Sequence, residues 1–184
     1  QIMTNIPASV RQQLLNRSRK EQRPFNELLQ YYAMERFLYR LSVSPYKDRF
    51  ILKGALMLQV WGSTGVRSTM DIDLLGKTSN KEAIIVNQVW DILQIRIDDD
   101  GLLFDPASIT SERITEDTDY EGIRIRFQGS LEKAKIHMQI DIGFGDIVYP
   151  EYEEHSLPVI LDMPIPRLLC YSRESAIAEK LETM

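Results

Sequence analysis

Apolar residues in the first third of the chain recur at helical spacing. Residues 6–20 carry a proline where the first turn of a helix would tolerate it, and Val10, Leu14 and Leu15 share one face. Pro24 interrupts this pattern, and a second helix is predicted over residues 25–41. Its polar residues Glu35, Arg36 and Arg40 are expected on the faces away from a wide apolar stripe. That stripe consists of Leu28, Leu29, Tyr32, Phe37, Leu38 and Leu41.

The middle of the chain combines short apolar segments with one longer helical pattern. Residues 54–61 are almost entirely apolar, which predicts a short buried helix. Residues 71–75 alternate as a strand does, whereas residues 80–97 repeat their apolar positions with the period of a helix. The acidic run at residues 98–101 ends in glycine and predicts a turn.

Two strand patterns in the second half are the clearest in the sequence. Apolar and polar side chains alternate strictly over residues 122–128 and 135–142, and the link through Gly129 predicts a β-hairpin. Beyond residue 150 the chain is rich in proline and is expected to be irregular. A last helix is predicted from Ser172 or Arg173. Because it shows no stop signal before the end of the sequence, we expect the natural protein to continue.

These elements predict an α+β protein in three parts. A helical segment occupies residues 1–48, a mixed α/β core residues 49–165, and the start of a C-terminal helical part residues 166–184. The chain has 184 residues, and 43% of them are apolar, which is enough to fill the core of an ordinary domain.

Composition narrows the classes of protein that fit. No apolar run approaches the roughly 20 residues needed to cross a bilayer, and no signal-type segment is visible, so a soluble cytoplasmic protein is expected. The single cysteine, Cys170, excludes an intrachain disulfide and is expected to be buried. Residues 1–70 hold 11 of the 22 Lys and Arg but 4 of the 27 Asp and Glu, a net +7 against −12 for the remainder. A basic surface of this kind suits a polyanion, although helix surfaces rich in arginine are equally common.

Three carboxylates stand out because of their positions in the predicted strands. Side chains alternate across a strand, so Asp71 and Asp73 project from one face while Ile72 enters the core. The same parity places Asp141 on the polar face of the strand at residues 135–142. Three such carboxylates with few histidines or cysteines nearby favour Mg²⁺ or Mn²⁺ over zinc. An Asp-x-Asp pair alone is weak support, since exposed strand ends also carry one by chance.

Metal-bound carboxylates of this kind are what nucleotidyl transfer requires. Two metal ions can bind the attacking and leaving oxygens of an in-line displacement at phosphorus. A third carboxylate can accept the proton of the attacking hydroxyl. We therefore treat Asp71, Asp73 and Asp141 as candidate catalytic residues and metal ligands.

Four segments in a fixed order resemble a known family. They are Phe50-Ile-Leu-Lys-Gly-Ala-Leu-Met-Leu, Arg67-Ser-Thr-Met-Asp-Ile-Asp-Leu, Gln139-Ile-Asp-Ile-Gly-Phe-Gly-Asp146 and Glu174-Ser-Ala-Ile-Ala-Glu-Lys180-Leu-Glu. Together they resemble the nucleotidyltransferase toxins of the AbiEii/AbiGii group, which are similar to the MenT toxins. The resemblance implies a polymerase-β-like nucleotidyltransferase core, a mixed sheet flanked by helices, with a largely helical C-terminal part.

The resemblance also implies a binding site for a nucleoside triphosphate. Lys53, Gly54 and Ala55 match the start of the helix that approaches the triphosphate, although the family usually has Gly-Gly or Gly-Ser there and Ala55 departs from it. Lys180 matches a triphosphate-binding lysine, whereas Arg67 is a second candidate cation from its own chemistry, with a structural ion pair as the alternative. Asp146, beyond two glycines, is expected to lie off the strand.

The leading hypothesis is therefore a metal-dependent toxin that transfers a nucleoside monophosphate from NTP to an acceptor. By resemblance to the MenT toxins the acceptor is the 3′ end of tRNA, which would block translation, and a cognate antitoxin is the expected partner. Two alternatives stay open at this stage. The acceptor is a small molecule or a protein, or the chain is a nucleotide-binding module that acts through a protein partner without turnover.

Overall fold

The computed structural model describes residues 5–58, 69–117, 120–145 and 152–172. The described chain forms one mixed sheet of seven strands in the order β3-β4-β5-β2-β1-β7-β6. The strands are β1 (Phe50–Lys53), β2 (Ile72–Gly76), β3 (Leu102–Asp117), β4 (Tyr120–Leu131), β5 (Ala134–Gly143), β6 (Tyr152–Ser156) and β7 (Arg167–Tyr171). The β2–β5 and β1–β7 pairs are parallel, and the other neighbours are antiparallel.

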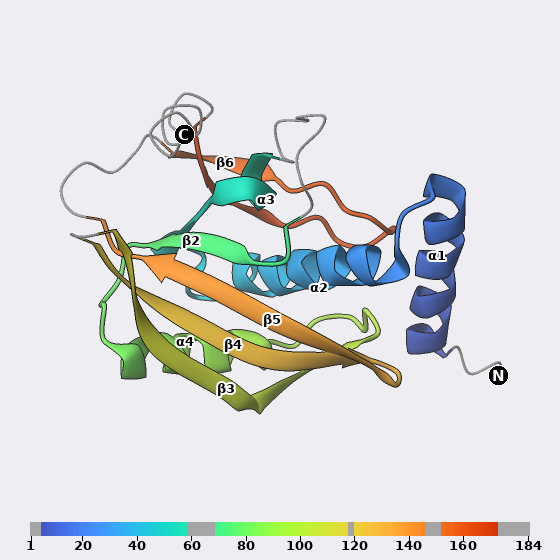
Figure 1. The fold of residues 1–184 in the computed structure, drawn as a ribbon, viewed down its shortest axis with the longest axis horizontal. Helices are drawn as coiled ribbons and strands as arrows, with labels where there is room; N and C mark the ends of the chain where they lie inside the picture. Colours follow the sequence, from blue (N-terminus) through green and yellow to red (C-terminus); the bar gives the residue numbers. More distant parts are fainter. Residues whose placement is uncertain (1–4, 59–68, 118–119, 146–151, 173–184) are drawn as a thin grey trace.

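Helices cover one face of this sheet and one of its ends. They are α1 (Ile6–Glu21), α2 (Phe25–Ser42), α3 (Gly54–Leu58) and α4 (Glu82–Leu93), with a 3₁₀ turn, η1, at Lys47–Arg49. In Figure 1, α2 and α4 lie behind the sheet, and α1 stands at the end where the β4–β5 hairpin turns. The arrangement agrees with the predicted α+β class and with a mixed sheet flanked by helices.

The core lies between α2, α4 and the sheet, as the alternation of the strands predicts. Ile136, Met138, Ile140 and Ile142 of β5 are all nearly inaccessible, and they share a cluster with the apolar stripe of α2. Because this face must remain apolar, the alternate residues of β5 emerge on the opposite face of the sheet. Cys170 is buried on β7, as predicted, and burial raises the pKa of its thiol to about 12.

Several expectations about local structure were wrong. The predicted β-hairpin is confirmed as β4–β5, but Gly129 lies inside β4 and not in the link, and the chain turns at Glu132 and Lys133, where Glu132 adopts a positive φ of 53°. The region after residue 150 is not irregular throughout, because β6 and β7 extend the sheet there. Strand β3 was not predicted at all, since Pro106 and a register shift between Asp105 and Thr110 interrupt its alternation.

Three polar residues of α2 that were expected on its exposed faces are buried. Glu35 and Arg36 are inaccessible to solvent, and Arg40 is only 6% exposed. Arg40 forms a two-contact ion pair with Asp100, at 2.8 and 3.2 Å, so the predicted turn at residues 98–101 is anchored to the helix. Periodicity could not reveal this because the partners are far away in sequence.

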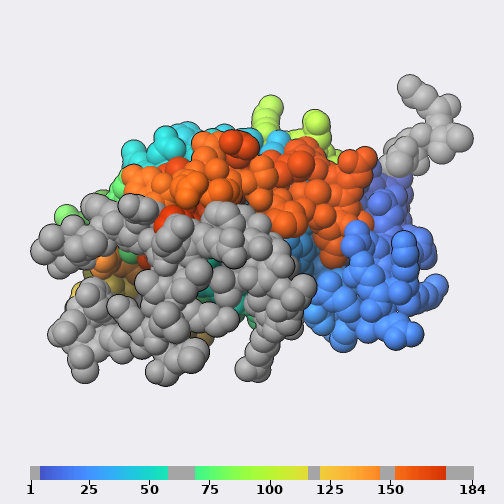
Figure 2. Space-filling view, turned by 90° about the horizontal axis from the view of Figure 1, so that it is seen from above, coloured from blue at the N-terminus to red at the C-terminus, as the bar shows by residue number. Residues whose placement is uncertain are grey.

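Glu35 and Arg36 contact the segment between β6 and β7, residues 157–166. Glu35 Oε2 accepts a hydrogen bond of 2.9 Å from the backbone N–H of Ile160, and Arg36 donates one of 2.6 Å to the carbonyl of Pro164. Arg17 of α1 donates another to the carbonyl of Ile160. Figure 2 shows this part of the chain, in orange, beside the N-terminal helices in blue. Buried polar groups of α2 thus fix a segment that has no regular structure.

Candidate active site

The parallel pairing of β2 with β5 brings two of the predicted carboxylates together. Asp73 is the register partner of Asp141, and the neighbouring pairs are Ile72 with Ile140 and Leu74 with Ile142. Partners in register project from the same face of a sheet, and the isoleucines and leucine are buried on the other one. The carboxylates of Asp73 and Asp141 therefore emerge side by side, opposite the face covered by α2.

Asp71 immediately precedes β2, two residues before Asp73, and its side chain is half-buried. Burial is the main cause that raises the pKa of Asp71, and the negative charge of Asp141 raises it further. Gln139 connects the two groups, since its Nε2 lies 3.4 Å from Asp71 Oδ2 and 3.4 Å from Asp141 Oδ1. All three predicted carboxylates thus lie in one region, on the side of the sheet that α2 does not cover.

Arg124 is a site residue that sequence reasoning missed. Its Nε donates to Asp141 Oδ1 at 2.8 Å, and its Nη2 donates to Asp141 Oδ2 at 3.1 Å. The hydrogen bond to Asp141 is the first cause that raises the pKa of this guanidinium. The signal was present in the hairpin, because Arg124 is the register partner of Asp141. The alternation along the two strands does not specify this register, so the pairing was not predicted.

The other side of Asp73 faces the start of α3. Lys53, the last residue of β1, is the register partner of Asp73 on the antiparallel neighbour. Gly54 follows with a φ of +76°, and a Cβ atom at this position would collide with Asp73 Oδ2. The glycine is therefore required both by its backbone conformation and by the close approach of the carboxylate. Ala55 is the next residue of α3 and is half-buried.

Two predicted nucleotide-binding residues, Arg67 and Lys180, lie outside the described residues, as does Asp146. The predicted helix at the end of the chain lies outside them too. The structure therefore brings together Lys53, Gly54, Asp71, Asp73 and Asp141, with Ala55 adjacent.

The donor atoms at this site fit a hard divalent cation. Asp71 and Asp73 supply carboxylate oxygens, and Asp141 supplies two more that are at present bound by the guanidinium of Arg124. Among the described residues, no three His, Cys, Asp or Glu side chains converge as a complete ligand cluster. Burial first and the charge of Asp141 second raise the pKa of Asp71, and a bound cation would favour the charged carboxylate against both effects.

Comparisons with known proteins identify the family. The sequence profile described as "Nucleotidyl transferase AbiEii toxin, Type IV TA system" matches residues 36–184, and the chain belongs to this family. No curated protein matches this chain. Two solved structures from Helicobacter pylori are similar. JHP933 is 19% identical to this chain, with a TM-score of 0.49, and the match covers 83% of this chain and 55% of JHP933. A candidate nucleotidyltransferase has 18% identity, a TM-score of 0.48 and coverage of 83% and 57%.

This chain thus spans little more than half the length of those two structural relatives. In the part that the structure describes, no helix is long and apolar enough to cross a membrane.

Proposed function

We propose that this chain transfers a nucleoside monophosphate from a nucleoside triphosphate to a hydroxyl group of an acceptor. The observation that carries the proposal is the in-register pairing of Asp73 with Asp141, with Lys53 at the end of the neighbouring strand β1 and Gly54 at the start of α3. A pair of carboxylates beside a lysine and a closely approaching backbone is the arrangement that phosphoryl chemistry needs.

Asp71, Asp73 and Asp141 would hold Mg²⁺ or Mn²⁺ in this reaction. Divalent ions at such a site neutralise the negative charge that develops on the triphosphate. Lys53 adds a positive charge next to Asp73, and the missing side chain of Gly54 lets the Asp73 carboxylate lie against the backbone. We assign Arg67 and Lys180 to the triphosphate as well, on the basis of the family resemblance.

The chemical step exchanges one phosphorus–oxygen bond for another. The acceptor oxygen forms a bond to the α-phosphorus, and the bond from this phosphorus to the bridging oxygen of pyrophosphate breaks. Pyrophosphate leaves with the electron pair. We assign Asp141 as the group that accepts the hydroxyl proton, and Arg124 as the residue that orients its carboxylate through two hydrogen bonds.

The family supports a role as the toxin of a type IV toxin–antitoxin system, with a cognate antitoxin as partner. We extend the proposal to the acceptor, for which the 3′ end of tRNA is the candidate, because the sequence resembles the MenT toxins. Modification of that end would stop translation.

The test is transfer of label from each of the four α-³²P-labelled NTPs, in the presence of Mg²⁺, to total RNA, protein and small molecules of a cell lysate. The full-length protein should label one fraction, and Asp73→Asn should abolish this labelling. Arg113→Gln, which neutralises an exposed cation on β3, is the control and should retain it. Full labelling by the Asp73→Asn variant would refute the assignment.

A further inference from the structure

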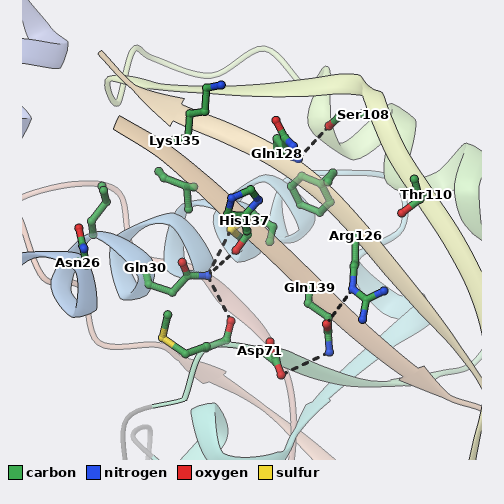
Figure 3. A pocket seen from close by; sticks show the side chains of 15 residues that line it. Asn26, Gln30, Asp71, Ser108, Thr110, Arg126, Gln128, Lys135, His137 and Gln139 are labelled. Carbon is green, nitrogen blue, oxygen red and sulfur yellow. Dashed lines mark hydrogen bonds between the residues drawn. The ribbon is translucent and has the colours of Figure 1, made fainter. Parts of the chain in front are cut away.

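A cavity of about 600 Å³ opens beside the carboxylates, where strand β5 extends past the start of its neighbour β2. Strand β5 begins at residue 134, but β2 pairs with it only from residue 140 onward. Within the described residues, no strand lies beside residues 134–139 on that side. Asp71 stands at one end of the cavity, and Lys135 lies toward the other in Figure 3.

The side chain of Gln30, on helix α2, lies at the bottom of this cavity. Gln30 is 7% exposed, and its Nε2 donates hydrogen bonds to the carbonyls of His137, at 2.9 Å, and Met70, at 3.2 Å. These contacts satisfy carbonyls that would otherwise lack a partner from a neighbouring strand. The floor of the cavity is thus fixed by a buried side chain, so the cavity is a built feature of the fold.

The lining changes character along the cavity. Met70, which is 51% exposed, gives one wall an apolar surface, whereas the neighbouring lining residue Leu29 is only 4% exposed. The β4–β5 wall is polar and carries the cations Arg126 and Lys135 together with His137. Lys135 has no carboxylate within ion-pair distance among the described residues. Among the described residues that line the cavity, Asp71 is the only carboxylate, and it lies at the proposed reaction centre.

Arg126 also connects the cavity to the carboxylates. Its Nε donates to Gln139 Oε1 at 3.1 Å, and the amide of Gln139 lies 3.4 Å from both Asp71 and Asp141. Its Nη1 lies 3.1 Å from Glu112 Oε1, in an ion pair that is exposed on both sides. Exposed pairs of this kind are weak, so a phosphate can compete with Glu112 for this guanidinium.

We propose that this cavity is the subsite for the acceptor, and that it takes a hydroxyl compound carrying a phosphate group. The phosphate lies at Arg126 and Lys135, a sugar or base ring contacts Met70, and the reacting hydroxyl points toward Asp71 and Asp141. The inference rests on the proposed nucleotidyltransferase activity and specifies where its second substrate binds. The phosphate belongs either to a small sugar phosphate or to the end of a nucleic acid chain.

The test measures acceptor binding without turnover. The full-length protein and its Arg126→Gln, Lys135→Gln and Arg113→Gln variants are titrated with two probes, ribose 5-phosphate and a short fluorescent oligoribonucleotide with a free 3′ hydroxyl. The first two variants should each weaken binding of the accepted probe on the order of tenfold, because each loses one charged phosphate contact. Arg113→Gln should bind as the wild type does, since Arg113 is an exposed cation of β3 outside the cavity.

The two probes separate the two sources of the phosphate. Binding of the oligoribonucleotide alone assigns a nucleic acid end, and binding of ribose 5-phosphate, alone or as well, assigns a small sugar phosphate. If neither probe binds, or if all three variants bind alike, the cavity is not the acceptor subsite. Binding of Mg²⁺–NTP is measured for the same variants. Retained NTP binding with an Asp73-dependent transfer activity would then leave the proposed function intact while the subsite fails.

Discussion

Replacement of Glu35 by glutamine should make the stability of the protein less dependent on pH. Burial raises the pKa of Glu35 from 4.5 to about 7, and the charge of Arg36 and the N–H of Ile160 oppose this shift only in part. A carboxyl whose pKa is higher in the folded state than in the unfolded state stabilises the fold in its protonated form. Its contribution is complete below pH 4.5 and is lost as the pH rises through about 7.

The size of the effect follows from the shift. Each unit of pKa difference corresponds to about 1.4 kcal/mol, so the shift of Glu35 from 4.5 to about 7 corresponds to about 3.5 kcal/mol over the full titration. Glutamine is neutral throughout this range and retains an oxygen that can accept the hydrogen bond from Ile160. The variant therefore removes the titration and preserves the contact with residues 157–166.

The assay is urea unfolding, followed by circular dichroism, at several pH values between about 4.5 and about 8. The quantity of interest is the unfolding free energy of the wild type minus that of Glu35→Gln, because other carboxyls titrate equally in both proteins. This difference should fall by up to about 3 kcal/mol as the pH rises. A difference that stays constant, or that grows with pH, would refute the reasoning.

Two further substitutions test features of the fold. Gly54→Ala should destabilise the protein by about 1–3 kcal/mol and impair transfer, because the backbone conformation at this position is strained for alanine and the added Cβ displaces Asp73. The control is Gly145→Ala, where an added Cβ would meet only Leu75, at an ordinary distance of 3.4 Å. Similar losses from both variants would contradict this explanation. Asp100→Asn should cost roughly 3–5 kcal/mol in chemical unfolding, because it leaves the buried Arg40 charge unpaired. Glu21→Gln, which breaks the exposed pair with Arg17, should cost less than about 1 kcal/mol, and a cost as large as that of Asp100→Asn would show that burial does not decide the effect.

The face on which each candidate carboxylate lies could be predicted from the sequence, because alternation in a strand is a local property. The apolar residues of β5 had to share one face, so Asp141 had to lie on the other, and the structure bears out this parity. Alternation does not specify which strands are neighbours. The pairing of Asp73 with Asp141 required a parallel register between distant segments, which the structure supplies.

Partners that are distant in sequence account for what the sequence could not reveal. Arg40 and Glu35 looked like solvent-exposed helix residues until Asp100 and the N–H of Ile160 were found beside them. Arg124 was missed because alternation assigns it to the polar face of β4 but does not specify that it lies opposite Asp141 in the β4–β5 register. The cavity beside Asp71 depends on where β2 begins relative to β5, a property of register and not of composition.

The parallel contact between β2 and β5 also has a consequence for how the protein folds. Gln139 and Asp71, which meet at this contact, are 68 positions apart, whereas the β4–β5 hairpin joins residues close in sequence. Closing a long loop costs entropy before the new pairing stabilises it, so the hairpin is expected to form early and the β2–β5 ladder late. During synthesis, Asp73 leaves the ribosome well before its partner strand exists. A partly made chain therefore has Asp71 and Asp73 but not Asp141, and the proposed activity can arise only once β5 has been made and has paired with β2.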